Sequence, residues 1–339
     1  MAKKIRLNNV DVLKTSSGRV LDLDNISFVA APSNGKADGH SSTAALAMSR
    51  GGYNSGGIWL RKTTVKSYEA SANISGYANL GYNVYGAQAG SDGSTHWAVS
   101  GYNGNNINST SSLSFASGAT STTASMNNLS KVRYGSSHST PDFLLISHGY
   151  NGSNNISNYR KALWSSMATS ASYGDGTADR HGGASATNDT DGWFFGGSST
   201  TAAADRTQGI QVKSLASSAN AVSTQGIMNR SHVHGGGCAN GDEAIISHGY
   251  GNNTYCLKKD LRSNANTTNF GALSSTQKKY SDYAASSSEE GIFVGGTRSD
   301  TSSYTASCEK KSFSSSANAA DWGNADEVGG YRAVASGNS

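Results

Sequence analysis

A short apolar run that ends in glycine recurs six times along the chain, and this repeat limits the fold more than any other feature. The glycines follow one another at intervals of 47 to 52 residues in a chain of 339 residues. These anchor glycines are Gly52, Gly101, Gly149, Gly197, Gly249 and Gly296. A fixed period of this length is typical of solenoids and propellers, in which each repeat is one supersecondary unit.

Other strand-like runs accompany the anchors. A small-residue segment that begins with a basic residue precedes several of them, as in 133–137 and 180–184. Third and fourth runs follow the anchors and are clearest at 58–60, 210–213, 255–258, 269–273 and 320–323. Four short strands in a unit of this size are the blade of a β-propeller. We therefore expect an all-β chain whose residues 31–339 form a six-bladed β-propeller with four-stranded blades.

The C-terminal run at 331–336 resembles the first strand of a blade, but the chain stops before another anchor. We predict that it pairs with the first anchor run at 45–48. Such pairing would close the ring with strands from both ends of the chain and remove exposed sheet edges.

Composition agrees with this fold. The chain has 41 glycines and only 15% charged residues, whereas 16 tyrosines, 8 phenylalanines and 5 tryptophans provide aromatic anchors. Low charge with many aromatics argues against a disordered chain, and no long segment has the spacing of an amphipathic helix. Small residues suit inner strands that pack closely around a narrow axis, and glycine suits tight turns.

Charge and apolar runs exclude several partners and locations. The net charge is +4 and is spread thinly, without the clustered Lys and Arg that nucleic-acid binding needs. No run of about 18 apolar residues is present, and the N-terminus has no secretory signal. We expect a protein made in a cytoplasm, with no nucleic-acid partner and no membrane insertion. Three cysteines without metal-like spacing indicate buried or incidental thiols rather than a disulfide framework.

The order of signals within each repeat resembles a degenerate kelch repeat: a basic residue, a small-residue strand, an apolar strand ending in glycine, then an aromatic such as Trp322. The segments 266–273, 283–287 and 291–296 resemble Gly/Ser/Asn-rich repeat proteins of tailed bacteriophages, including cyanophages. The second resemblance implies a virion component, either a head decoration or part of a tail appendage.

Residues 1–30 differ from the repeats and alternate apolar with polar residues, with turn signals at Asn8-Asn9 and 16–18. This pattern predicts strand, turn and strand. The segment also resembles the leading β segment of phage fibre proteins, which implies attachment to other virion proteins or trimerisation. A strand that packs on the propeller is the alternative.

Tyrosines follow four anchor glycines at equivalent positions, and asparagines cluster beside them at 103–106 and 151–155. Aromatic faces with neighbouring amides hold sugars by stacking and hydrogen bonding, so these positions are candidates for a glycan site. The alternative is that each tyrosine packs between blades and each Asn-Gly forms a turn. The candidate ligand-binding residues are Tyr53, Tyr102, Tyr150, Tyr250, His148 and His248. The two histidines recur at equivalent repeat positions, which favours a structural role for them.

Catalytic patterns are weak. His232 and His234 stand two apart on a presumed strand, which would place both on one face, but a solvent-facing strand is the more ordinary explanation. Acidic residues are few and lie in predicted turns, and no phosphate-binding glycine loop is present. We predict no catalytic residues, no metal and no cofactor.

Together with these patterns, the resemblance to tailed-phage proteins implies a non-enzymatic structural or adhesion component of a virion that contacts host surface polysaccharide and assembles through virion symmetry. The alternatives are a kelch-type protein- or carbohydrate-binding module outside a virion, and an oxidase or lyase on the same scaffold. The functional part rests mainly on resemblance.

Overall fold

The computed structural model describes residues 4–7, 10–14, 46–50, 63–71, 73–74, 78–118, 121–188, 190–200, 206–222, 225–247, 249–250, 254–273, 279–280, 283–298, 305–325 and 334–337. The chain divides into two compact units, Met1–Ala31 and Pro32–Ser339. Apart from the 3₁₀ turn η1 (Trp164–Ser166), the described elements are all β-strands, so the all-β prediction is confirmed. Within these ranges, no helix has the length and apolar character needed to cross a membrane.

The smaller unit contains an antiparallel pair, β1 (Lys4–Leu7) and β2 (Val10–Lys14). Leu7 lies opposite Val10, and Lys4 lies opposite Lys14. This pairing matches the first two predicted strands, whereas the turn predicted at Asn8-Asn9 lies outside the described residues. The apolar positions predicted further along, at 21–28, lie outside the described residues.

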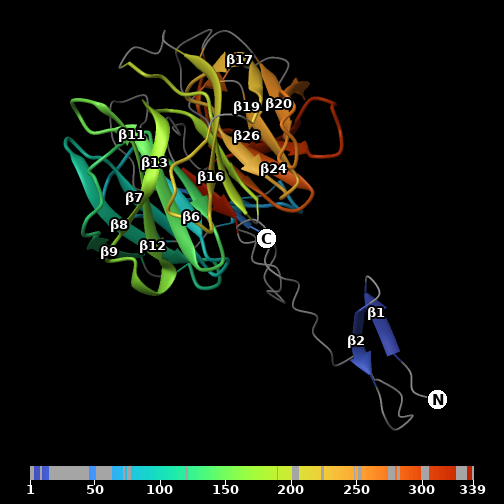
Figure 1. The fold of residues 1–339 in the computed structure, drawn as a ribbon, viewed down its shortest axis with the longest axis horizontal. Coiled ribbons are helices and arrows are strands. Elements are labelled where there is room, and N and C mark those ends of the chain that lie inside the picture. Colours follow the sequence, from blue (N-terminus) through green and yellow to red (C-terminus); the bar gives the residue numbers. More distant parts are fainter. Residues whose placement is uncertain are drawn as a thin grey trace. The chain divides into compact units, whose positions relative to one another are not determined.

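The sheets of the larger unit are arranged as a β-propeller with four-stranded blades (Figure 1). Five blades each come from one continuous stretch of chain, and neighbouring strands within a blade are antiparallel. The first is β6 (Gln88–Ser91), β7 (Thr95–Tyr102), β8 (Asn106–Ser114) and β9 (Ser121–Ser125). The second is β10 (Ser136–Ser139), β11 (Phe143–Tyr150), β12 (Asn155–Leu163) and β13 (Ala171–Arg180).

The remaining three continuous blades follow the same order. They are β14 (Ala184–Thr187), β15 (Asp191–Phe195), β16 (Thr207–Ser214) and β17 (Ile227–His232); β18 (Gly237–Ala239), β19 (Glu243–Ser247), β20 (Tyr255–Asp260) and β21 (Thr268–Ala272); and β23 (Tyr283–Ser286), β24 (Glu290–Val294), β26 (Ser307–Ser312) and β27 (Ala320–Asn324). A small separate pair is formed by β22 (Lys279–Tyr280) and β25 (Thr297–Arg298). In every continuous blade the anchor run is the second strand, as the repeat pattern predicts.

A further four-stranded sheet joins both ends of the larger unit, and we call it the end-joining sheet. Its order is β28 (Val334–Gly337), β3 (Leu46–Arg50), β4 (Thr63–Ser67) and β5 (Asn73–Ile74). Val334 lies opposite Arg50, which confirms that the C-terminal strand pairs with the first anchor run. The third-strand signal at 58–60 lies outside the described residues. β28 also contacts β6 and β23, the innermost strands of the first and last continuous blades.

Small residues line the inner strands because neighbouring blades approach closely there. A Cβ atom on Gly90 of β6 would lie 2.4 Å from Leu144 Cδ1 of the next blade. One on Gly237 of β18 would lie 2.6 Å from the backbone oxygen of Ser185. Neither position has room for a side chain, so the small-residue composition is a packing requirement.

Apolar side chains fill the spaces between successive blades. Trp193 and Phe195 of β15 pack in one buried cluster with Ile246 and Leu257 of the following blade. Burial of such side chains stabilises the fold by about 1.5 to 3 kcal/mol each. The three cysteines are buried free thiols, as predicted.

Buried lysines close the turn after the third strand in four of the sheets, and we call them the turn lysines. They are Lys66, Lys213, Lys259 and Lys311, each at most 1% exposed. Lys259 Nζ donates to the carbonyl oxygens of Asp260 (2.7 Å) and Ser263 (2.5 Å) and lies over the Trp193 ring. Burial lowers the pKa of Lys213, Lys259 and Lys311, and the carbonyl oxygens offset the lost hydration.

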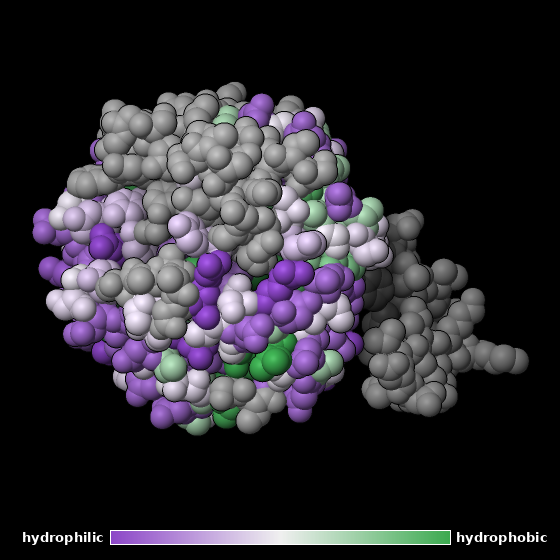
Figure 2. Space-filling model, turned by 90° about the horizontal axis from the view of Figure 1, so that it is seen from above, coloured by the Kyte–Doolittle hydropathy of each residue, from purple (hydrophilic) through white to green (hydrophobic). Residues whose placement is uncertain are grey.

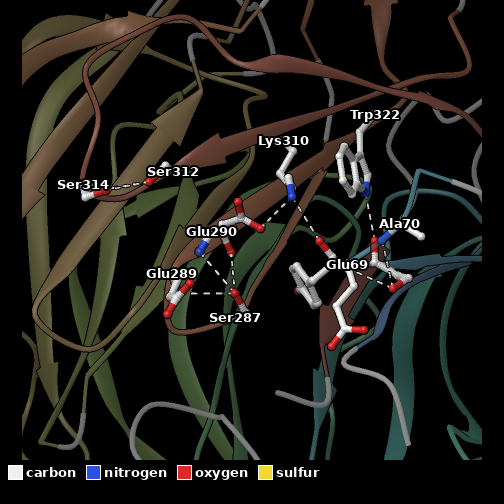
Figure 3. A network of polar contacts seen from close by, with 11 residues as sticks. Glu69, Ala70, Ser287, Glu289, Glu290, Lys310, Ser312, Ser314 and Trp322 are labelled. Carbon is white, nitrogen blue, oxygen red and sulfur yellow. Dashed lines mark hydrogen bonds and ion pairs between the residues drawn. The ribbon is translucent and has the colours of Figure 1, made fainter.

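The last continuous blade meets the end-joining sheet through a polar network (Figure 3). Lys310 Nζ lies 2.9 Å from Glu290 Oε2, 3.6 Å from the centre of the Trp322 ring, and donates to the Tyr68 carbonyl oxygen at 3.1 Å. Trp322 Nε1 donates to the Ser67 carbonyl oxygen at 2.8 Å. Segments more than 240 positions apart in the sequence are thereby joined.

The same arrangement recurs one blade earlier. Lys258 Nζ lies 2.7 Å from Glu243 Oε1, lies over the Phe270 ring, and donates to the Phe313 carbonyl oxygen at 2.9 Å. The end-joining sheet is thus contacted by its neighbour in the way that one continuous blade contacts another.

Candidate functional site

One edge of the blades brings together the start of each first strand and the end of each second strand, and we call it the mouth edge. Isolated bridges pair Tyr85 with Tyr102, Arg133 with Tyr150, and His181 with Ser198. The opposite edge, where the turn lysines lie, is the turn edge. Three successive blades therefore place equivalent residues at the mouth edge.

The predicted tyrosines after the anchor glycines pack between blades. Tyr102 lies against Tyr85 with ring centres 5.3 Å apart, and the guanidinium carbon of Arg133 in the next blade is 4.4 Å from its centre. Tyr150 lies between Arg133 (5.2 Å) and His181 of the following blade (6.2 Å). Both tyrosines are half-buried. Tyr102 and Tyr150 therefore pack between blades, as the alternative to a glycan site predicts.

The other two tyrosines differ. Tyr250 is 40% exposed and lies beside Arg206, whose Cζ is 5.5 Å from the ring centre. Tyr53 lies outside the described residues.

The asparagines near these tyrosines join neighbouring blades. Asn106 Nδ2 donates to the Tyr150 carbonyl oxygen at 3.4 Å, and Asn155 Nδ2 donates to the Ser198 carbonyl oxygen at 3.1 Å. Arg206 at the equivalent position donates to the Tyr250 carbonyl oxygen. Asn106 and Asn155 are the first residues of third strands, and Arg206 directly precedes one. All three side chains reach the next blade, so Asn106 and Asn155 are connectors between blades.

A chain of backbone hydrogen bonds runs from blade to blade at the mouth edge. Tyr134 N donates to Gly86 O (2.7 Å), Gly182 N to Tyr134 O (2.8 Å), and His234 N to Gly182 O (2.5 Å). These four residues occupy equivalent positions and share a left-handed backbone, with φ between 59° and 67°. Glycine adopts this conformation freely, but Tyr134 and His234 are strained in it. Strain of this kind persists at binding and catalytic sites more often than elsewhere.

Five side chains from four successive blades gather at this edge, and we call them the mouth cluster. They are Tyr85, Arg133, Tyr134, His181 and His234. The Tyr134 ring centre lies 5.9 Å from those of Tyr85 and His181 and 5.7 Å from that of His234. Tyr134 and His234 belong to blades separated by another blade, so their contact places the cluster toward the axis.

Arg133 supplies the charge of the mouth cluster. Its Cζ lies 4.4 to 5.2 Å from the ring centres of Tyr102, Tyr134 and Tyr150. Its Nη1 lies 3.2 Å from Tyr85 Oη, and its Nε is buried without a hydrogen-bond partner. The cluster thus combines an aromatic face, a guanidinium and two imidazoles. The aromatic face can stack against a ring, and the guanidinium can donate hydrogen bonds to an anion.

His148 lies inside the propeller rather than at its surface. It is 1% exposed, its ring stacks on Phe194 with centres 4.0 Å apart, and its Nε2 lies 3.4 Å from Gln211 Oε1. Burial lowers the pKa of His148 to about 3, and burial likewise lowers the pKa of nearby His138 to about 4. His148 therefore packs between blades as a neutral ring, out of reach of a surface ligand. His248 lies outside the described residues.

The two histidines considered as a chelating pair do not share a strand. β17 ends at His232, which is buried, and His234 follows in the left-handed conformation. The strand expectation for this pair is wrong because the chain turns toward the mouth edge between them. Within the part of the chain that the structure describes, no three His, Cys, Asp or Glu residues gather as metal ligands would.

Exposed apolar residues are scattered. The face drawn in Figure 2 is mainly hydrophilic over its described residues, with hydrophobic residues in small patches. The large exposed ones are Leu163, Val222, Ile227, Tyr250 and Tyr255. Isolated exposed apolar residues are normal on a protein surface and do not define a docking face.

No protein-family model matches this chain, and no curated protein matches it either. What the mouth cluster can bind is therefore argued from its own chemistry.

The sequence repeat pointed to the mouth edge through Tyr102 and Tyr150, but it did not predict that Tyr134 and His234 lie there. A signal for them exists, because they stand where the repeat has Gly86 and Gly182. A bulky residue at a position where other repeats have glycine is a sequence signal for a candidate binding residue.

Proposed function

We propose that this chain is a non-enzymatic adhesion or decoration protein of a tailed-phage virion, and that its propeller holds a surface glycan at the mouth cluster. The observation that carries glycan binding is the placement of Tyr134 and His234 in a strained backbone conformation where equivalent repeats have glycine. The blade-to-blade hydrogen bonds do not require a strained residue. Gly86 and Gly182 take part in the same chain of bonds, and glycine adopts the left-handed conformation without strain.

The chemistry of the mouth cluster suits a sugar. A half-buried aromatic ring offers a face for the C–H groups of a pyranose, and neighbouring donors fix its orientation. Tyr134 provides the ring, while Arg133, His181 and His234 provide polar atoms beside it. No bond to the sugar needs to be made or broken for this role.

Glycan binding is tested with a panel of bacterial surface polysaccharides and the purified full-length chain. The Tyr134→Gly variant should bind at least tenfold more weakly, because it removes the stacking face and leaves the backbone relaxed. Tyr255→Ala is a matched control, since Tyr255 is an exposed tyrosine that also lies beside an arginine, Arg230. Absence of binding to every polysaccharide, or equal binding by Tyr134→Gly, would overturn the glycan site.

The virion role rests on the resemblance of segments 266–273 and 283–296 to phage repeat proteins, with residues 1–30 attaching the chain to other virion proteins. The chain would be made in the host cytoplasm and then assembled. Quantitative mass spectrometry of purified particles should find it at a fixed number of copies per particle. Glycan binding together with absence from particles would favour a kelch-type binding module outside a virion.

The non-enzymatic part has its own test. Incubation of the protein with each bound polysaccharide should release neither hydrogen peroxide nor unsaturated or shortened products. Release of either would favour an oxidase or a lyase and overturn this part of the proposal.

We further propose that the end-joining sheet is the sixth blade of the ring. Support comes from β28, which contacts the innermost strands of the first and last continuous blades, and from Lys310, which repeats the contacts of Lys258. Electron-microscopy averages of the isolated protein viewed down the axis should show six radial sheets. An average with five would overturn the proposal.

A further inference from the structure

We propose that the ligand of the mouth cluster is an acidic polysaccharide and that Arg133 binds its carboxylate groups. This inference rests on the proposed glycan binding and adds the class of sugar.

The guanidinium of Arg133 is half-buried, and no carboxylate among the described residues pairs with it. A charge removed from water is normally paired, because an isolated buried ion is strongly unfavourable. Three tyrosine rings surround the group and stabilise its charge, but a ring face does not neutralise it. The mouth cluster therefore retains a positive charge held in a fixed place.

Several other described cations of the propeller have acceptors in the protein, although Arg160 also has a buried Nε without a hydrogen-bond partner. Lys258 and Lys310 pair with Glu243 and Glu290. The turn lysines are satisfied by backbone carbonyl oxygens, and Arg180 near the mouth edge donates to the carbonyl oxygens of Gly196 and Gly209. Arg133, in contrast, donates to one side-chain acceptor, Tyr85 Oη, and its buried Nε has no hydrogen-bond partner.

The geometry around Arg133 suits a carboxylate attached to a ring. A guanidinium presents its N–H groups in a planar fork that matches the two oxygens of a carboxylate. Its Cζ lies 5.2 Å from the centre of the Tyr134 ring. A uronic acid could therefore stack on Tyr134 while its carboxylate meets Arg133. The rings of His181 and His234, with centres 5.6 Å apart, lie on the other side of Tyr134, and His181 Nδ1 is hydrogen-bonded to Asn155 Oδ1 at 3.0 Å.

The test compares polymers that differ in charge. Polygalacturonate, the same polymer after chemical reduction of its carboxyl groups, and dextran sulfate are titrated into the full-length protein at 50 and 300 mM salt. We expect polygalacturonate to bind at least tenfold more tightly than the reduced polymer and to lose affinity as salt rises.

Two variants assign the effect to Arg133. Arg133→Gln should remove the preference for the carboxylated polymer, whereas Arg133→Lys should keep part of it because the charge remains without the fork. The matched control is Arg206→Gln, since Arg206 also lies beside a strand-end tyrosine and donates to a carbonyl oxygen; it should leave the preference unchanged. Should Arg133→Gln fail to fold, Arg133→Lys still tests the role of Arg133, because an unchanged preference in that variant would overturn it. The salt dependence and the reduced polymer test the acidic preference with the unmodified protein.

The outcomes are distinct. Equal affinity for carboxylated and reduced polymers would overturn the acidic preference and leave glycan binding standing. Binding of dextran sulfate without polygalacturonate would overturn the carboxylate assignment. An unchanged preference in Arg133→Gln would overturn the role of Arg133, and no binding to any of these or the panel polysaccharides would instead overturn the proposed function.

Discussion

The two edges of the propeller follow different rules. At the turn edge, four sheets repeat one solution: a buried lysine whose ammonium donates to the carbonyl oxygens of the turn after the third strand. At the mouth edge, the backbone repeats, but the side chains at equivalent positions do not. Gly86, Tyr134, Gly182 and His234 share one conformation and one chain of hydrogen bonds.

This difference distinguishes residues that stabilise the blade from residues that the blade does not need in order to fold. A group that supports folding recurs in most copies, as the turn lysines do in four of the sheets. A group that strains one copy and is absent from the next is unnecessary for the blade itself. The comparison therefore favours a stabilising role for the turn edge, and it supports the binding role that we propose for the mouth edge.

The largest effect on stability should come from acid, through two buried histidines. Burial lowers the pKa of His138 to about 4 and that of His148 to about 3, from an ordinary value of 6.5. Below pH 6.5 the unfolded chain takes up protons that the folded chain does not, so the free energy of unfolding falls as the pH falls. The loss is about 1.4 kcal/mol per pH unit for each histidine, or up to about 4 kcal/mol for both at pH 5.

Urea unfolding between pH 7.5 and 5 measures this loss. His148→Asn removes one titrating group, and asparagine tolerates the left-handed backbone better than most residues. It should reduce the pH dependence by about half. A flat profile in the unmodified protein would contradict the neutral, buried state of these rings.

The next effect concerns the turn edge. Lys259→Ala should lower the free energy of unfolding by about 3 kcal/mol, because it leaves turn carbonyls unpaired and removes packing against Trp193. Arg262→Ala is the control, since Arg262 pairs with Asp242 on the surface and should cost under about 1 kcal/mol. Glycan affinity of the folded Lys259→Ala protein should not change. Thermal unfolding and ligand titration of the same samples would show whether stability and binding separate in this way.

The smallest effect is expected at the mouth edge. Tyr134→Gly and His234→Gly relieve left-handed strain and lose ring contacts of similar size, so the free energy of unfolding should change by less than about 1 kcal/mol while binding is lost. His148→Gly relieves the same strain but also removes stacking on Phe194, and should destabilise by about 2 kcal/mol. Large destabilisation by both mouth substitutions would mean that these residues build the blade after all.

Much of the fold was predictable because it repeats. The six anchor runs located each second strand, and the lone run near the C-terminus indicated pairing with the first anchor, which β28 and β3 form. The turn lysines escaped notice because loops of different length separate them from the anchors, although their environments are the same. In the sequence, Arg133 is recognisable only as a basic residue before a strand. The three tyrosines that surround it come from different segments and meet it in the folded chain.

The order of apolar, small and glycine residues along the chain determined by itself that short strands would form and how they would group, because strand formation and turns depend on neighbouring residues. Only the tertiary structure decided which tyrosines pack between blades, which histidines are buried, and that Arg133 has no acidic partner among the described residues. Those properties depend on what lies across the blade interface, and residues there are about one repeat or more away in sequence.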